Sequence, residues 1–138
     1  MSQPKRIDHV AIIVRNLEQA LAFYRDRLGI EPGEVKEVPT EQVRIAFLPL
    51  GGIAGSEIEL IEPTTNDSSL TRFLEKRGEG LHHICLEVDD IDAALAEMRE
   101  KGVPVLDQQP RTAAEGRAIF LHPGGTNGVL LELLQKQE

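Results

Sequence analysis

The sequence predicts an α+β fold made of two tandem βαβββ modules, and three observations lead to this prediction. Short runs of β-branched and apolar residues alternate with segments of helical period. The order strand, helix and further strands occurs twice in 138 residues. The two occurrences also match residue by residue. Because two copies are too few for a solenoid, we expect their curved sheets to pair around a central cleft, which buries the sheet faces.

The first module is expected over about residues 5–63 and begins with a buried strand at residues 7–14. Asn16 then opens a helix, with Gln19 in the capping-box position, and Gly29 ends it. The helix directs its apolar residues inward, and these are Leu17, Ala20, Leu21, Tyr24 and Leu28. Three further strands are predicted at residues 31–38, 43–50 and 56–62, with a loop at 51–55.

A connector helix and the second module complete the predicted domain, which covers residues 5–138. Asp67 or Ser68 caps the connector helix, expected over about residues 67–78. The second module, over about residues 80–134, starts with a strand at 80–88, and Asp90 caps a helix that Gly102 ends. Its other strands are predicted at residues 103–106, 117–122 and 129–134.

The two modules match at a nearly constant spacing. Up to the helices the spacing between matched residues does not change, as in His9 with His83 and Leu17 with Ile91. After the helices it is shorter by a single position, as in Gly29 with Gly102, Arg44 with Arg117 and Glu59 with Glu132. A one-residue deletion in the second helix accounts for the change. We therefore interpret the chain as a duplication.

Composition limits the partners and the compartment. A net charge of −8 argues against a nucleic-acid or anionic-membrane surface, because both need clustered Lys and Arg. Cys85 is the only cysteine, so a disulfide framework is excluded and a reducing compartment is expected. The first residues carry no secretory apolar region, and the longest weakly polar run, residues 45–55, is too short to span a bilayer. These features predict a soluble, cytoplasmic protein.

Two residue types recur at matched positions. His9 and His83 lie on the first strand of each module, and Glu59 and Glu132 lie within apolar residues of the last strand. A carboxylate within an apolar strand is costly to bury unless it is paired, hydrogen-bonded or bound to a metal. If the modules pack with pseudo-twofold symmetry, the four side chains converge. Such N/O ligands favour Mn, Fe, Co, Ni or Zn over Ca, so the sequence predicts a transition-metal site.

Each of these residues also has a structural interpretation, as a core histidine or a solvent-facing glutamate. The other candidates are assigned structural roles. His82 must face the opposite side of its strand from His83, so its role is structural or the support of a metal ligand. His122 precedes Pro123 and is expected to shape the turn at residues 124–128. Cys85 is expected to be a small buried apolar residue.

Several motifs resemble one family over residues 7–134. They are residues 7–12 (IDHVAI), 80–84 (GLHHI), 88–91 (VDDI), 120–123 (FLHP) and 128–133 (GVLLEL). Together they resemble the methylmalonyl-CoA epimerase family of the vicinal oxygen chelate superfamily, the glyoxalase/bleomycin-resistance/dioxygenase group. The resemblance implies interconversion of (2R)- and (2S)-methylmalonyl-CoA in propionate metabolism, by C2 proton abstraction through a metal-stabilised enolate.

The resemblance also implies a ligand set and catalytic roles. It implies one divalent ion per chain, Co²⁺ first and Mn²⁺, Ni²⁺ or Zn²⁺ as alternatives, held by His9, Glu59, His83 and Glu132. Glu132 would be both ligand and base. Some family members have Gln at the position of Glu59 and a second acid near the position of Ile45, which this sequence lacks. The base on the opposite face is therefore Glu59, which we favour, or Glu41.

Partners and competing functions follow from the same resemblance. The family and the sheet edges suggest a homodimer. Contacts with the phosphates of coenzyme A have five candidates, although the expected role of most of them is a solvated charged face: Arg72, Lys76, Arg77, Arg111 and Arg117. Two alternatives stay open, namely a glyoxalase I-like lyase acting on a glutathione hemithioacetal and a metal-free small-molecule-binding protein of the superfamily.

Overall fold

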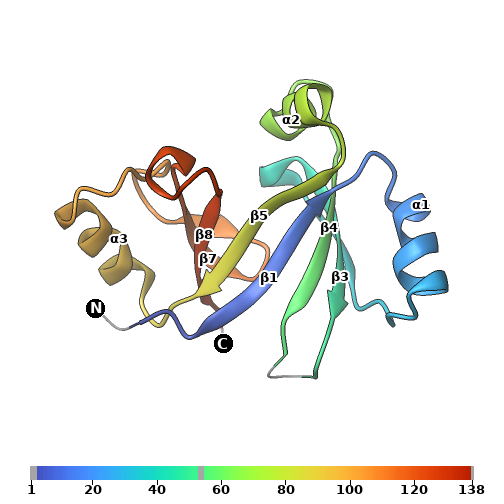
Figure 1. Cartoon of the computed structure of the whole chain (residues 1–138), viewed down its shortest axis with the longest axis horizontal. Helices are drawn as coiled ribbons and strands as arrows, with labels where there is room; N and C mark the ends of the chain where they lie inside the picture. Colours follow the sequence, from blue (N-terminus) through green and yellow to red (C-terminus); the bar gives the residue numbers. More distant parts are fainter. Residues whose placement is uncertain (1–2, 53–54, 138) are drawn as a thin grey trace. The chain divides into compact units, whose positions relative to one another are not determined.

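The computed structural model describes residues 3–52 and 55–137 and divides the chain into two compact units. The first unit is residues 9–82, and the second is residues 1–8 with residues 83–138. The strand order is β2-β3-β4-β1 in the first unit and β5-β8-β7-β6 in the second (Figure 1). Each unit thus contains the predicted βαβββ pattern, and the α+β class is confirmed.

The first unit begins within β1. The first three residues of this strand belong to the second unit. The elements of the first unit are β1 (Arg6–Ile13), α1 (Leu17–Leu21), a π-helix (Ala22–Arg27), β2 (Val35–Val38), a 3₁₀ turn (Pro39–Glu41), β3 (Val43–Pro49), β4 (Glu57–Pro63) and α2 (Ser69–Arg77). β4 pairs with β1 in parallel and with β3 in antiparallel orientation, and β2 pairs with β3 in antiparallel orientation.

The second unit repeats this pairing scheme. Its elements are β5 (Gly80–Glu87), α3 (Ile91–Glu100), β6 (Arg111–Ala113), β7 (Gly116–Leu121), a 3₁₀ turn (Pro123–Gly125) and β8 (Leu131–Lys136). The first three residues of β5 belong to the first unit. β8 pairs with β5 in parallel and with β7 in antiparallel orientation, and β6 pairs with β7 in antiparallel orientation. Among the described residues, no helix has the length and apolar character needed to cross a membrane.

Some predicted strands differ from the structure. The strand predicted at residues 103–106 is wrong, since Val105 makes only an isolated bridge to Leu121. Pro104 explains this, because it has no N–H to donate to a ladder. Strand β6 forms instead, and the sequence did not predict it. β2 begins at Val35, later than predicted, because Pro32 and Gly33 interrupt the run. In the loop predicted at 51–55, residues 53 and 54 lie outside the described residues.

The helix predicted to end at Gly29 is α-helical only in its first part. α1 has five residues and continues as a π-helix of six, whereas the matched helix α3 has ten. The Leu28 N–H donates to Phe23 O at 2.8 Å, five residues back, which is how a helix accommodates one extra residue. This length difference explains why the spacing of the repeat shortens by one position after the helices. Leu28, predicted to point inward, is 54% exposed.

Matched hydrogen bonds in the two units support the duplication. The side chains of Asn16 and Asp90 cap α1 and α3, as predicted. The Leu17 N–H donates to Glu62 Oε2, and the Ile91 N–H donates to Gln135 Oε1, both at 2.9 Å.

Two arginines also keep matched acidic partners. Arg44 lies 2.8 Å from Glu18, and Arg117 lies 3.0 Å from Asp92. Hydrogen bonds from these guanidinium groups hold the pKa of Glu18 and of Asp92 below their usual values. The duplication is therefore preserved in side-chain detail.

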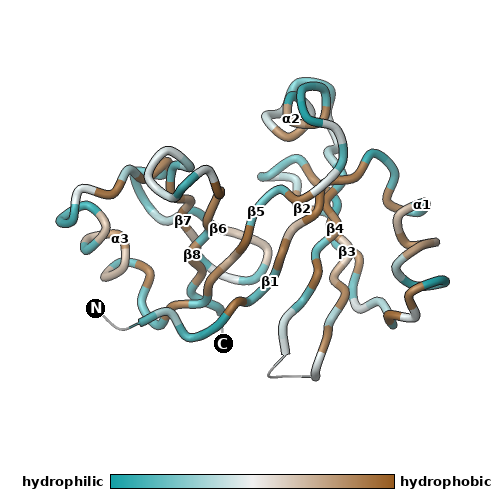
Figure 2. Tube along the Cα trace, viewed as in Figure 1, coloured by the Kyte–Doolittle hydropathy of each residue, from teal (hydrophilic) through white to brown (hydrophobic). Residues whose placement is uncertain are grey.

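In each unit the strands pack one face against the helix. α1 lies alongside β3 and β4, and α3 alongside β7 and β8 (Figure 1). Leu48 and Leu60 pack with Leu17 in the first unit, and Ile119 and Leu133 pack with Ile91 in the second. Figure 2 shows hydrophobic residues concentrated along the strands. Because side chains alternate along a strand, the remaining residues of each strand face away from the helix.

The cap of α2 gives a first prediction. Ser68 Oγ accepts a hydrogen bond from the Thr71 N–H at 3.1 Å and is buried, so Ser68 and not Asp67 is the cap. Ser68→Ala is expected to lower the free energy of unfolding by about 1 kcal/mol, and Asp67→Ala, the matched control, by a few tenths at most. Urea denaturation measures both. Equal losses in the two variants would contradict this assignment.

Candidate functional site

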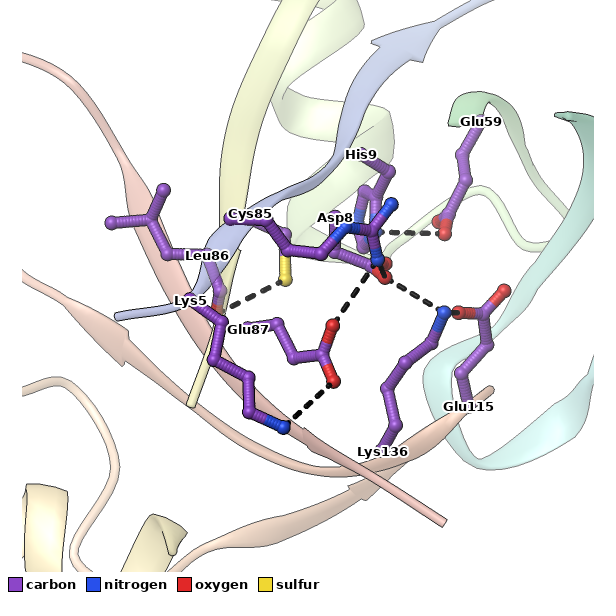
Figure 3. A network of polar contacts seen from close by, with 10 residues as sticks. Lys5, Asp8, His9, Glu59, Cys85, Leu86, Glu87, Glu115 and Lys136 are labelled. Carbon is purple, nitrogen blue, oxygen red and sulfur yellow. Dashed lines mark hydrogen bonds and ion pairs between the residues drawn. The ribbon is translucent and has the colours of Figure 1, made fainter. Parts of the chain in front are cut away.

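In the first unit His9 and Glu59 form a buried pair. His9 lies on β1 and Glu59 on the neighbouring strand β4, where Glu59 pairs in register with Ala11. His9 Nδ1 and Glu59 Oε2 are 3.0 Å apart (Figure 3). The two residues are only 3% and 4% exposed. Since His9 and Ala11 alternate with the residues that pack on α1, the pair lies on the sheet face opposite the helix.

In the second unit His83 and Glu132 form the matching pair. His83 lies on β5 and Glu132 on β8, opposite Cys85. His83 Nε2 and Glu132 Oε1 are 3.1 Å apart, and both residues are 6% exposed. Phe120 lies opposite Glu132 on β7, and its ring meets the His83 ring edge-on at 5.1 Å between centroids. The sequence match of His and Glu therefore becomes a direct contact within each unit.

These pairs have the chemistry that a divalent ion requires. Imidazole nitrogen and carboxylate oxygen are ligands that Mn, Fe, Co, Ni and Zn accept. Two such ligands, each about 2.1 Å from one ion and at a right angle, lie about 3.0 Å apart. The separations of 3.0 and 3.1 Å within the two pairs agree with that value and equally with a direct histidine–glutamate hydrogen bond. The residues present therefore fit a metal ion.

Arg111 joins the second pair. Its Nη2 lies 2.7 Å from Glu132 Oε2, and its guanidinium lies over the Phe120 ring at 4.1 Å from the centroid. The sequence placed Arg111 only among candidates for coenzyme A contacts. Its role beside Glu132 was missed because it lies on β6, and the polar residues 107–112 show no alternation that would predict a strand.

Asp8 is a third buried carboxylate, and the sequence analysis missed it. It is fully buried in the second unit, and Lys136 Nζ lies 2.8 Å from its Oδ1 (Figure 3). Arg6 Nη1 lies 3.4 Å from the same oxygen. Glu115 lies 3.6 Å from the same Lys136 nitrogen. A signal existed, because Asp8 is an acid within an apolar strand. Comparison of the two modules did not single out Asp8, because the residue at its matched position is His82 and not an acid. This network fastens the start of β1 within the second unit.

The remaining candidates have the structural roles predicted for them. His82 stacks edge-on against Phe73 at 4.9 Å. His122 Nδ1 accepts a hydrogen bond from the Gly124 N–H at 2.9 Å and so shapes the turn. Cys85 is fully buried and packs with Ala118 and Leu134.

The other three arginines considered for coenzyme A also have protein contacts. Arg117 contacts Asp92, Arg72 donates to the carbonyl of Asp67, and Arg77 lies over Phe73. Glu41, the alternative base, ends the 3₁₀ turn before β3 and is half-buried.

Known proteins share this sequence and fold. The family model of the glyoxalase/bleomycin resistance protein/dioxygenase superfamily matches residues 8–120. The ethylmalonyl-CoA/methylmalonyl-CoA epimerase of Cereibacter sphaeroides is 43% identical over 94% of this chain and 97% of its own length. The mitochondrial methylmalonyl-CoA epimerase of Bos taurus is 41% identical over 94% of this chain and 74% of its own length.

A solved structure extends the similarity to three dimensions. A variant of Streptomyces coelicolor methylmalonyl-CoA epimerase, in complex with 2-nitronate-propionyl-CoA, is 38% identical and has a TM-score of 0.93. The alignment covers 99% of this chain and 100% of that chain. These matches confirm the predicted resemblance to methylmalonyl-CoA epimerases. The chain belongs to the glyoxalase/bleomycin resistance protein/dioxygenase superfamily.

Proposed function

We propose that this protein is a methylmalonyl-CoA epimerase that interconverts the (2R) and (2S) forms of its substrate. The observation that carries the proposal is a buried histidine–glutamate pair at the same position in each unit. Relatives that align over nearly the whole chain are named for the same reaction. A reaction that moves a proton between two faces of one carbon suits a chain that carries such a pair twice.

We propose His9, Glu59, His83 and Glu132 as the ligands of one divalent ion. Co²⁺ is the first choice, with Mn²⁺, Ni²⁺ and Zn²⁺ as alternatives, because all accept nitrogen and oxygen ligands. When bound, the ion supplies positive charge that stabilises the negative charge developing on the carboxylate and thioester oxygens of the substrate. Support comes from the donor separations within each pair and from their burial, which excludes competing water.

The carboxylates perform the proton transfer in this proposal. Glu132 takes the proton from C2 on one face, and the electron pair of the broken C–H bond delocalises into the thioester. A carboxylic acid on the other face returns a proton to C2, which inverts the centre without net gain or loss of protons. We assign that second role to Glu59, because Glu59 is buried and paired with His9. Glu41 is the alternative.

Assembly and location follow by analogy with the family. We propose a homodimer in the cytoplasm. The edge strand β2, whose residues are mostly exposed, supports the dimer because an open strand edge is normally covered or paired. The single, buried cysteine suits a reducing compartment.

Hydrogen exchange at C2 tests the function directly. Methylmalonyl-CoA is incubated with the protein in D₂O and followed by proton NMR. The C2 proton signal is expected to disappear, to persist when EDTA is added, and to disappear again after Co²⁺ is restored, because the exchange needs both a base and the ion.

Other outcomes favour the alternatives. Absence of exchange together with activity on methylglyoxal and glutathione would assign the protein to the glyoxalase I-like lyases. Absence of exchange together with no uptake of divalent ions would favour the metal-free binding protein.

A further inference from the structure

Arg111 is held in place by three contacts within the second unit. Its Nη2 lies 2.7 Å from Glu132 Oε2, and its Nε lies 3.9 Å from Asp107 Oδ1. Its guanidinium plane lies over the Phe120 ring at 4.1 Å. The side chain is three-quarters buried, with an exposed fraction of 24%. An arginine stacked on an aromatic ring and paired with a carboxylate has little freedom left to rotate.

The two oxygens of Glu132 consequently have different partners. Oε1 faces His83 Nε2 at 3.1 Å, and Oε2 faces Arg111 at 2.7 Å. The last torsion of a glutamate is broad and gives no fixed orientation by itself. The contacts with Arg111 and His83 together therefore determine which way the carboxylate is turned. Charge-assisted contacts of this length are also among the strongest that a carboxylate makes.

The strand register shows that this cation has a counterpart in the first unit. Arg111 on β6 lies opposite Ala118, and Lys36 on β2 lies opposite Ile45. Ala118 and Ile45 are matched positions of the repeat, directly after the matched pair of Arg117 and Arg44. Both units thus place a basic residue at the same point of the sheet. Only the second unit has the planar fork of arginine, which a lysine cannot reproduce.

Charge balance gives Arg111 a further effect. While both glutamates are ionised, two carboxylates and two neutral imidazoles cancel the charge of a divalent ion, which weakens its attraction for an anionic substrate. A guanidinium in contact with one of these carboxylates adds a permanent positive charge, since arginine stays protonated in proteins.

We propose that Arg111 is a positioning residue for Glu132, which holds the carboxylate in the orientation that proton transfer at C2 requires and offsets its charge. This inference rests on the proposed function, in which Glu132 is a base and a ligand. It assigns Arg111 to the acyl end of the site instead of the phosphates of coenzyme A.

Steady-state kinetics of three Arg111 variants test the proposal. Arg111→Met is expected to lower kcat about 30- to 100-fold with KM for methylmalonyl-CoA within about threefold, because a misplaced base slows the chemical step. Arg111→Lys keeps the positive charge without the planar fork, so its kcat should lie between those of the wild type and Arg111→Met. Millimolar guanidinium should restore at least about fivefold of the lost kcat to Arg111→Ala. Arg44→Met is the matched control, since Arg44 contacts Glu18 and Glu62 on the helix side of its sheet.

The visible absorption of bound Co²⁺ gives a readout that does not depend on turnover. Arg111→Met is expected to change the intensity of the Co²⁺ bands, because a turned Glu132 alters the ligand field, whereas Arg44→Met should keep the wild-type spectrum.

Three results would overturn the proposal. One is a wild-type kcat and spectrum in Arg111→Met, and another is a rise in KM with kcat preserved, which marks a substrate contact. The third is a loss of kcat that neither lysine nor guanidinium restores. If Arg111→Met does not fold, the kcat of Arg111→Lys and the guanidinium rescue of Arg111→Ala test the proposal. If the wild-type protein shows no epimerisation, the proposed function fails, and the Co²⁺ spectra alone decide the role of Arg111.

Discussion

Glu132→Gln is expected to lower kcat for epimerisation by at least about 10³-fold, because an amide cannot accept the C2 proton and is a weaker metal ligand than a carboxylate. The substitution keeps the shape of the side chain. Its amide oxygen can still accept a hydrogen bond from Arg111, so the fold should survive despite the burial of this residue. The C2 exchange assay measures the loss of activity, and thermal unfolding followed by circular dichroism shows whether the fold is kept.

Glu87→Gln is the matched control for this variant. Glu87 lies on β5 in the same unit and pairs with Arg6 at 3.1 Å, away from the Glu132 pair. It should keep near-normal turnover. A Glu132→Gln protein with near-normal turnover would remove Glu132 from the proposed mechanism. The same comparison between Glu59→Gln and Glu41→Gln identifies the base on the opposite face, with the large loss expected in the Glu59 variant.

Loss of a histidine is expected to empty the metal site. His83→Ala removes one of two imidazole ligands, so the metal content after dialysis should fall from about one ion per chain to about a tenth or less, and epimerisation should cease. His9→Ala, in the other unit, should have the same effect if both pairs hold a single ion. Elemental analysis and calorimetric titration with Co²⁺ measure the stoichiometry.

The stoichiometry separates one shared ion from two independent ions. With independent ions, each histidine variant would lose only its own ion and keep the other. His82→Ala is the matched control, because His82 neighbours His83 and stacks on Phe73 instead of pairing with Glu132. Full metal content in the His83 variant would disprove its assignment as a ligand.

Local signals explain what the sequence predicted well. Asn16 and Asp90 cap their helices because a short polar side chain before an apolar helical run reaches the backbone of its own first turn. The histidine–glutamate pairs could be predicted because the repeat placed the same two residue types on matched strands. Each pair then forms between neighbouring parallel strands of its own unit.

Features that depend on distant partners were not predictable. Arg111 reaches Glu132 only because β6 pairs with β7, and nothing in the run around Pro110 indicates that pairing. Asp8 is tolerated in the interior because Lys136, far along the chain, supplies a cation. The strand predicted around Pro104 does not form, because proline has no N–H to donate to a neighbouring strand. Such contacts are set by tertiary structure, which a local pattern does not contain.

The π-helix at residues 22–27 indicates that the duplication came before the change in helix length. Only one of the two copies carries the extra residue. The length difference must therefore have arisen after the ancestral unit was copied, when the halves were already inherited together. A relative whose two helices are equal in length would preserve the older state.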